Sequence, residues 1–445
     1  MFIVMGKGIR YVQCQITDFI GVVISVIRIT IEELKRMGSK RKKRSNILKG
    51  LKIDLKTGVQ RTIIEYLDEG ARRAANKFKK LSNFLRIRVP KISEPPSTLP
   101  PVERLSIQNP SCKGFLDRLF YFHDFRIWDA WYRRNIKDTD RLEYDPRAFI
   151  RALIIMCKRK IKGYTGLHTQ LNENSRLAEL CLLEPYDIPD RTMFSRVIDK
   201  VGLMPFYLEF YNLVYKCKEM GILPCRIVGV DGSLLESNCR PYKNGDGLYN
   251  DADAGIYIRG NYIKGVGYNQ FFMTDLEYGL PCCFDVFKGS QNESTMLPPL
   301  LQGHYFWHGT YPDTIIADSI MDSSNLHALC DVQGIDLYVT IRDKRRKNLI
   351  QIKPGKYIRE NRTAVYDIHY LDKLLTLRLE SERNFSRMKW VYDRRRMPNK
   401  GMDNAAAYVA ITGITMLLTA YTAMRMGRGD LIRSPTAFSK IMPEI

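Results

Sequence analysis

The sequence predicts an α/β fold, in which a mixed sheet is flanked by helices and preceded by a helical region. Apolar residues recur at helical spacing through residues 113–221, short strand-like runs begin at residue 227, and helix-like and strand-like segments alternate after residue 290. The chain has 445 residues and is 45% hydrophobic, so it can bury a large core in two or three domains. This composition excludes a mainly disordered protein.

Residues 1–100 are predicted to form a basic N-terminal arm or region that ends in a Pro-rich linker. Residues 1–110 contain 23 Lys and Arg against 9 Asp and Glu, in a chain whose formal net charge is +22. The run Glu-Pro-Pro-Ser-Thr-Leu-Pro-Pro at 94–101 favours an extended linker. This charge excess favours a nucleic-acid partner, because each neutralised phosphate releases counterions. A membrane-surface protein or a solvated arm would show the same balance.

Residues 101–221 are predicted to be an α-helical DNA-binding domain. Asp145 followed by Pro146 indicates a helix start, because Asp caps free amides and proline suits the first helical position. Further helices are expected at 166–182, from about 190 to 202, and at 204–220. Short helices with tight turns fit a helix-turn-helix arrangement, in which Arg191 and Arg196 would face DNA. A plain helical bundle with incidental arginines fits equally well.

Residues 222–427 are predicted to form the sheet domain, followed by a tail at 428–445. Strands are expected at 227–230, 268–274, 280–287, 314–317 and 335–341, and helices at 294–301, 321–333 and 378–392. Three strands joined by hairpins and followed by alternating helices and strands are the element order of a ribonuclease H-like fold. The basic segment 342–375 leaves room for only a small insertion before the last helix.

Two aspartates follow predicted strands that this fold makes neighbours. Asp231 is expected to close the first strand and Asp318 the fourth, so the two carboxylates would meet at one end of the sheet. Cleavage of a phosphodiester by two divalent ions requires such converging carboxylates. Either aspartate taken alone is more often a turn residue or a helix cap.

A third acid is expected from the helix at 378–392. At 100° per residue, Arg378, Glu382 and Lys389 share one face of that helix, and Glu380 points elsewhere. The helix therefore favours Glu382 as the third metal ligand, with two cations beside it for a phosphate backbone. Ordinary exposed ion pairs on a solvated helix would use the same residues.

These segments resemble the DDE-class insertion-sequence transposases of bacteria and archaea. Arg378-x3-Glu382-x6-Lys389 is similar to the R-E-K part of the family's Y-R-E-K motif, although Leu375 stands at its tyrosine position. The segments around Asp231 and Asp318, and the stretch Asn292-Glu-Ser-Thr, also look like the family's. The resemblance covers about residues 110–425.

The resemblance implies a DNA transposase, active in the cytoplasm of a prokaryote near its nucleoid. It would cut transposon ends and join their 3′-hydroxyl ends to target DNA, using two Mg²⁺ ions that Mn²⁺ can replace. Double-stranded DNA would be its partner, within a homodimeric synaptic complex. The phosphate contacts it implies are with Arg378, Lys389, Lys344, Arg345, Arg346 and Lys347. A catalytically inactive DNA-binding relative would show the same resemblance.

Two further features are interpreted as structural rather than functional. The uncharged segment 405–424 is long enough to span a membrane, but threonines recur along one of its faces, which favours a buried C-terminal helix over a membrane-associated protein. His304 and His308 have metal-compatible helical spacing. Because no third ligand is evident around them, they are interpreted as core or surface histidines.

Overall fold

The computed structural model describes residues 114–136, 143–240, 249–259, 262–341, 349–354, 356–359 and 368–441. All of them belong to one compact unit. The predicted basic arm and its linker at 1–100, and the four basic residues Lys344, Arg345, Arg346 and Lys347, lie outside the described residues.

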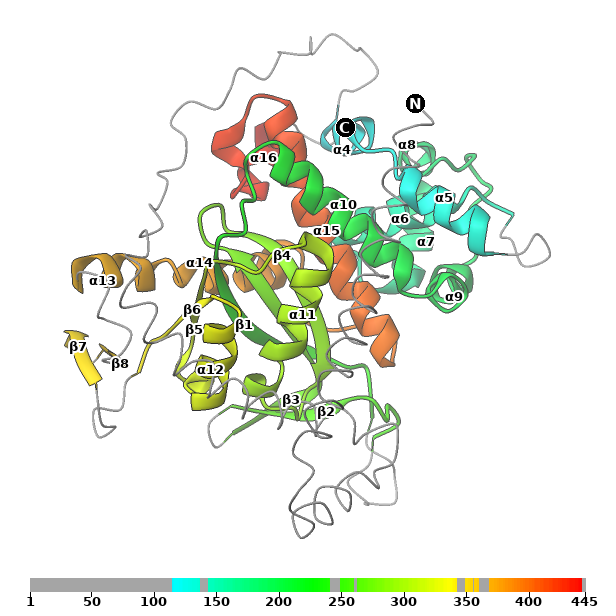
Figure 1. Cartoon of the computed structure of the whole chain (residues 1–445). Coiled ribbons are helices and arrows are strands. Elements are labelled where there is room, and N and C mark those ends of the chain that lie inside the picture. Colours follow the sequence, from blue (N-terminus) through cyan, green and yellow to red (C-terminus); the bar gives the residue numbers. More distant parts are fainter. Residues whose placement is uncertain are drawn as a thin grey trace, which may run out of the picture. The chain divides into compact units, whose positions relative to one another are not determined.

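The first described part of the chain is helical, as predicted (Figure 1). Its helices are α4 (Phe115–Phe122), α5 (Arg126–Asn135), α6 (Pro146–Lys158), α7 (Gly163–Glu173), α8 (Ser175–Leu180), α9 (Arg191–Val201) and α10 (Met204–Glu219). Asp145 caps α6 by accepting a hydrogen bond from the Arg147 amide, and Pro146 occupies the first helical position. The expected helix at 166–182 is wrong in one respect: it is two helices, because Asn174 is extended and caps α8 instead.

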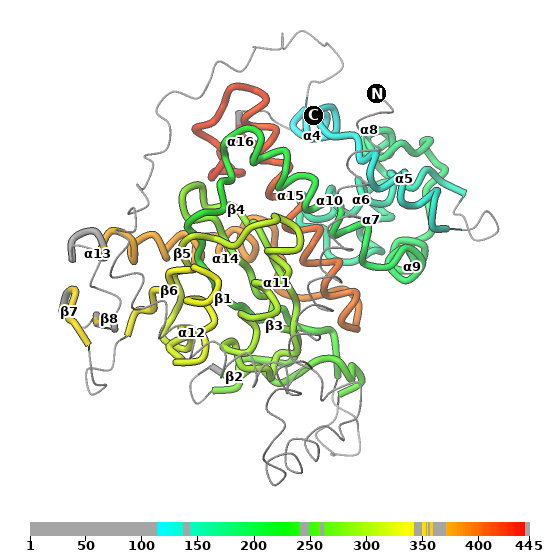
Figure 2. The backbone as a smooth tube through the Cα atoms, viewed as in Figure 1, coloured from blue at the N-terminus to red at the C-terminus, as the bar shows by residue number. Residues whose placement is uncertain are grey.

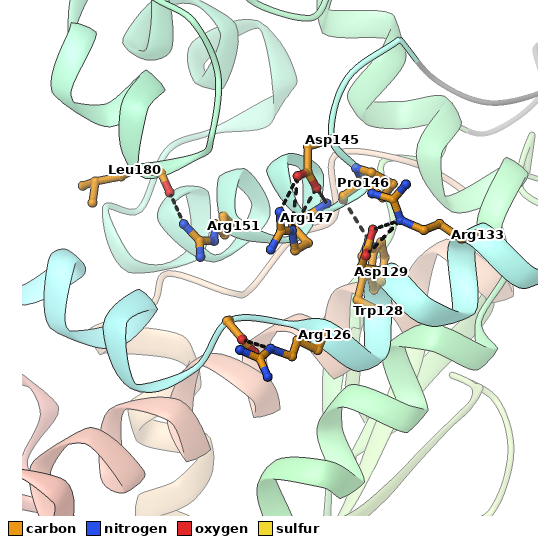
Figure 3. Close-up of polar contacts among 10 residues, drawn as sticks. Arg126, Trp128, Asp129, Arg133, Asp145, Pro146, Arg147, Arg151 and Leu180 are labelled. Atoms are coloured by element: carbon orange, nitrogen blue, oxygen red, sulfur yellow. Dashed lines mark hydrogen bonds and ion pairs between the residues drawn. The ribbon is translucent and has the colours of Figure 1, made fainter. Parts of the chain in front are cut away.

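Polar contacts hold α5 and α6 to their neighbours (Figure 3). The indole Nε1 of Trp128 donates to the carbonyl of Pro146 at 2.8 Å, and Arg151 donates to the carbonyl of Leu180 at 3.0 Å. Trp128 and Arg151 are both largely buried, so each bond satisfies a donor that water cannot reach. These contacts fix α6 as the central helix of this part.

The sheet has the strand order and connections of a ribonuclease H-like fold. The strands are β1 (Ile227–Glu236), β2 (Gly255–Arg259), β3 (Tyr262–Asp275), β4 (Leu280–Lys288), β5 (Thr314–Ala317) and β6 (Asp336–Val339). β3 pairs antiparallel with β1 on one edge and with β4 and β2 on the other, while β1, β5 and β6 run parallel. The predicted mixed sheet flanked by helices is therefore confirmed.

The sequence misplaced the limits of two long strands and missed a third strand. β1 continues to Glu236, so Asp231 lies within the strand instead of closing it. β3 begins at Tyr262 instead of 268, and β2 was not expected. These errors share a cause: the long β1–β3 pairing carries polar and glycine residues that lack a strand pattern, and tertiary pairing overrides their weak propensity.

Helices cover both faces of the sheet (Figures 1 and 2). α11 (Leu297–His308) and α12 (Ser324–Val332) are the crossovers before and after β5. α14 (Leu379–Ser386) packs on β1 and β3, and the long helix α15 (Met402–Arg425) packs on β4, α10 and α6. Between β6 and α14 lie a two-stranded sheet, β7 (Leu349–Lys353) with β8 (Lys356–Arg359), and the helix α13 (Ile368–Thr376). α16 (Pro435–Ile441) follows α15.

α15 is a core helix by its burial. It is the one described helix long and apolar enough to cross a membrane, and that apolar window is entirely buried within the fold. Three of its threonines satisfy their hydroxyls inside the helix: Thr412, Thr415 and Thr419 each donate to the carbonyl four residues earlier. The expectation of a buried C-terminal helix is confirmed.

Candidate active site

Asp231 and Asp318 lie at the same level on neighbouring parallel strands. β1 and β5 pair in the register Ile227 to Thr314 through Gly229 to Ile316. Two more residues in that register bring Asp231 level with Asp318, which directly follows β5. Asp318 caps the 3-10 turn η3 (Ser319–Met321) by accepting from the Ser319 amide at 2.7 Å. The predicted meeting of two distant acids therefore has a physical basis in strand register.

Both aspartates line one open cavity of about 840 Å³. Both are half-buried, so their carboxylates reach solvent from a fixed backbone. The wall continues through Gly232 in the middle of β1, through β2, and through the loop between β4 and α11. A cavity of this size accommodates a segment of a polymeric substrate, since it matches ordinary ligand sites in volume.

The cavity opens where one edge of β1 has no partner strand among the described residues. Along that edge, β5 pairs with the start of β1, and the chain at Arg395–Met397 pairs with Glu236 at its end. Asp231 lies between these two partners. The gap in pairing exposes the strand next to its carboxylate.

Glu382 lies on α14, which packs on the same face of the sheet that Asp231 faces. Side chains alternate along β1, so Gly229 and Asp231 share a face. A Cβ at Gly229 would meet the Ser381 hydroxyl of α14 at 2.0 Å, so only glycine lets the helix approach this closely. The side chain of Glu382 is 48% exposed and does not line the cavity described above. Its carboxylate accepts from Arg378 at 2.8 Å.

The two glutamates of α14, Glu380 and Glu382, lie on different sides of the helix. Glu380 is buried and forms ion pairs with Arg383 and Arg387 beside the β3–β4 turn, so it points away from Glu382, as expected. The helix is α-helical only to Ser386 and continues as a π-helical turn, η5 (Arg387–Val391). Lys389 lies in that wider turn, so the expected helix to 392 and its 100° spacing are wrong there.

Leu375 leaves the family's tyrosine position without a polar group. It is 4% exposed and packs in a small core cluster with Ile316 and Tyr338 of the sheet. A buried leucine here offers no hydrogen-bond donor or acceptor on its side chain.

Glu293 is a third carboxylate of the cavity, beside Asp231 and Asp318, that the sequence did not single out. It lies in the 3-10 turn η2 (Glu293–Thr295), which contacts η3. A Cβ at Gly232, next to Asp231, would meet its Oε1 at 2.6 Å. Asn269 donates to the same oxygen at 3.3 Å. The sequence signal for Glu293 is the segment Asn292-Glu-Ser-Thr, which resembles a segment of the transposase family but does not by itself assign a role to the glutamate.

A basic hollow lies beside the far end of β1. It has a volume of about 430 Å³ and is lined by Lys160, Lys162, Arg395 and Arg396 among others. Trp390 is 65% exposed, and the guanidinium of Arg395 stacks on its ring at 3.8 Å. Lys160 donates to the Trp390 carbonyl at 3.0 Å, which joins the helical region to the segment after α14. None of these residues was predicted as a DNA contact.

Arg191 and Arg196 are both exposed on α9. α9 packs against α7 through its apolar face, which leaves the two arginines toward solvent. This exposure is compatible with a DNA contact and with a solvated bundle, so the expectation stays a prediction.

The acids of the cavity fit a hard divalent cation. Mg²⁺ and Mn²⁺ prefer carboxylate oxygen and water ligands, and Asp231, Asp318 and Glu293 offer only such oxygens. Asp231 accepts a hydrogen bond from the Gly232 amide at 2.9 Å, which orients its carboxylate.

The fold and two sequence families identify the chain in two steps. Its sheet order and crossovers define a ribonuclease H-like protein. Residues 242–418 match the family described as Transposase DDE domain, and residues 103–200 match a transposase domain family, DUF772. The first match includes Asp318 and Glu382 and begins after Asp231. The chain belongs to the DDE-class insertion-sequence transposases, and its function is DNA transposition.

Solved structures of transposases are similar to this chain at low identity. A piggyBac transposase synaptic complex with hairpin DNA is 13% identical, covers 75% of this chain and 83% of its own, and has a TM-score of 0.39. A Mos1 transposase paired-end complex is 11% identical, with coverages of 52% and 78% and a TM-score of 0.17. The Mos1 strand transfer complex is 10% identical, with coverages of 59% and 78% and a TM-score of 0.17. No curated protein sequence matches the chain.

Proposed function

We propose that this transposase cleaves transposon ends and joins the freed 3′-hydroxyl to target DNA with two divalent metal ions. The observation that carries the proposal is the shared level of Asp231 and Asp318 in one cavity. Two ions about 4 Å apart would stabilise the attacking and the leaving oxygen of an in-line displacement. Mg²⁺ would be the natural ion, and Mn²⁺ can replace it because its ligand preference is similar.

The acids take different roles in this proposal. Asp231 and Asp318 would hold the ions, because both line the cavity. Glu382 would complete the site from α14, once its Arg378 partner turns to a DNA phosphate and frees the carboxylate. Glu293 would orient metal-bound water from the α11 side.

Two surfaces would hold the DNA. The first surface is formed by Arg378, the N-cap of α14, and by Lys389 in its π-helical extension. The second is the basic hollow with Lys160 and Arg395, which lies beside Glu236 at the end of β1. Glu236 is five residues beyond Asp231, about 17 Å at the usual strand rise. Phosphates at this spacing would bind along one track, with Trp390 available to stack on a base. Arg191 and Arg196 would contact the transposon end, and the second end would require a second copy of the chain.

The test is metal-dependent cleavage of a plasmid that carries the reading frame with its natural flanking DNA. Asp231→Asn and Asp318→Asn should each lower Mg²⁺-dependent cleavage by about 1,000-fold or more while DNA binding persists. Asp313→Asn is the matched control. Asp313 lies directly before β5, the strand that Asp318 directly follows, and it forms an exposed ion pair with Arg226. Cleavage by the two variants at the wild-type rate would overturn the proposal.

An inactive, DNA-binding relative is the second candidate, and Leu375 is the observation that favours it. The experiment above separates the two. A wild-type chain that binds its flanking DNA but does not cleave it in Mg²⁺ or in Mn²⁺ would be the inactive relative.

A further inference from the structure

A second cluster of metal-ligating side chains lies away from the acidic cavity. Cys225, His304 and His308 each offer one ligand atom, and these atoms all lie within 4.8 Å of one another. His304 and His308 occupy the last turns of α11, whose other end follows Glu293. The helix separates the two places by roughly 16 Å, since it rises about 1.5 Å per residue.

His304 brings an unpartnered nitrogen into this cluster. The residue is 1% exposed, and its Nδ1 donates to the carbonyl of Thr310 at 2.9 Å. That bond leaves Nε2 as the acceptor, and Nε2 has no hydrogen-bond partner among the described residues. A buried acceptor without a partner is destabilising, and a metal ion would use this lone pair.

Cys225 reaches the cluster from a strained position before β1. Its φ of 56° is left-handed, a conformation that a residue with a side chain rarely adopts. The backbone is held there because the Cys225 amide donates to Asp275 at 2.8 Å. The buried thiol of Cys282 forms a side-chain hydrogen bond with Cys225.

The buried surroundings of both histidines disfavour the charged imidazole, and the neutral form is the one that binds a metal. Burial lowers the pKa of His304 to about 4 and lowers the pKa of His308 well below its ordinary value. His308 is held by Lys218, which donates to its Nδ1 at 2.9 Å, and by the carbonyl of Cys282. A bound ion would replace one of these two contacts.

We infer that Cys225, His304 and His308 form a structural zinc site at the edge of β4. One sulfur and two imidazole nitrogens are the borderline-soft set that Zn²⁺ prefers and Mg²⁺ avoids. The ion would tie the loop before β1 to the end of α11 and so brace the strand that carries Asp231. Binding would release the thiol proton of Cys225, because the thiolate is the ligand. The inference does not rest on the chemistry of the acidic cavity.

The test uses the intact chain purified without a histidine tag, stripped with a chelator and given one equivalent of Zn²⁺. Mass spectrometry of the metal content should find about one zinc per chain that persists in excess Mg²⁺. Replacement by Co²⁺ should produce sulfur-to-cobalt charge-transfer absorption. Zinc should also raise the thermal unfolding midpoint, because a ligand that binds only the folded state stabilises it.

Variants keep the inference falsifiable. Cys225→Ser should abolish the charge-transfer band, and His308→Gln should lower zinc affinity by about 100-fold or more, since even outer partners of a metal are worth about 10–100-fold. Cys181→Ser removes a buried thiol of α8's C-cap and should leave binding unchanged. Asp231→Asn should also keep its zinc. A stripped wild-type chain that binds no zinc, or a folded Cys225→Ser that binds it as tightly as wild type, would overturn the inference.

Discussion

Ser381 on α14 packs directly against Gly229 on β1, and no side chain larger than hydrogen fits between them. Asp231 follows Gly229 on the same face of the strand, and Glu382 follows Ser381 on the helix. The contact therefore sets how near the two proposed ligands come. A further bond, from the Asn384 side chain to the Thr274 hydroxyl at 2.9 Å, holds the same helix to β3 at the residue that pairs with Gly229.

Gly229→Ala should destabilise the protein by about 1–3 kcal/mol, the usual cost of overpacking a core contact. The added methyl would also meet Leu276 at 2.8 Å, so the helix must move. Urea unfolding measures the stability, and cleavage should fall more than stability predicts because Glu382 moves with the helix. Gly303→Ala is the control: it lies in α11 with its nearest neighbour at 3.9 Å and should be neutral or slightly stabilising. Equal stability of both variants would show that the α14 contact is loose.

Arg378→Gln should weaken DNA binding and reduce its salt dependence by about one ion, the expectation for one lost phosphate contact. The measurement is the slope of the logarithm of the binding constant against the logarithm of salt concentration. Arg383→Gln is the matched control on the same helix, because Arg383 pairs with Glu380 on the other side. If the two variants share one slope, Arg378 does not touch DNA.

Glu293→Gln should raise the Mg²⁺ concentration needed for half-maximal cleavage by about tenfold, because the carboxylate is proposed to orient metal-bound water. A metal titration of the cleavage rate measures it. The control Glu179→Gln removes an exposed partner of Arg176 in the helical part. An unchanged Mg²⁺ requirement would limit Glu293 to its bonds with Asn269 and Tyr257.

The buried carboxyl of Asp275 should make the free energy of unfolding decrease as the pH rises from about 4 to about 7. Burial raises the pKa of its carboxyl from 3.8 to about 7 in the folded state. The folded protein therefore binds the proton more tightly than the unfolded chain, so this contribution is full below the unfolded pKa and is lost as the pH passes the folded one. Asp275→Asn should flatten the pH dependence of urea unfolding in that window. Asp313→Asn, an exposed change, should leave the slope as in wild type.

The sequence was sufficient where a local pattern and a regular element coincided. The limits of β5 and the caps of α6 and α9 follow from short apolar runs, Asp caps and a terminal glycine, all of which act within a few residues. Asp318 was predicted correctly at the end of its strand for that reason. The pairing of β1 with β5 followed from topology, because few arrangements join these elements.

The rest depends on contacts between distant residues. The length of β1 is set by its pairing with β3 and with Arg395–Met397, which no local pattern reports. Glu293 becomes a cavity residue only because η2 folds over Gly232. Likewise, Cys225 is 79 residues from His304, so spacing could not supply the third donor that His304 and His308 lacked.

The most direct test of the central claim is anomalous diffraction at the manganese edge from crystals of the intact protein grown with Mn²⁺. The account predicts an ion bound by both Asp231 and Asp318 at about 2.1 Å from their oxygens, as expected for octahedral ions of this kind. It also predicts that Asp318→Asn removes the ion while the fold persists. Manganese absent from the cavity at saturating concentration, or bound with no contact to either aspartate, would contradict it.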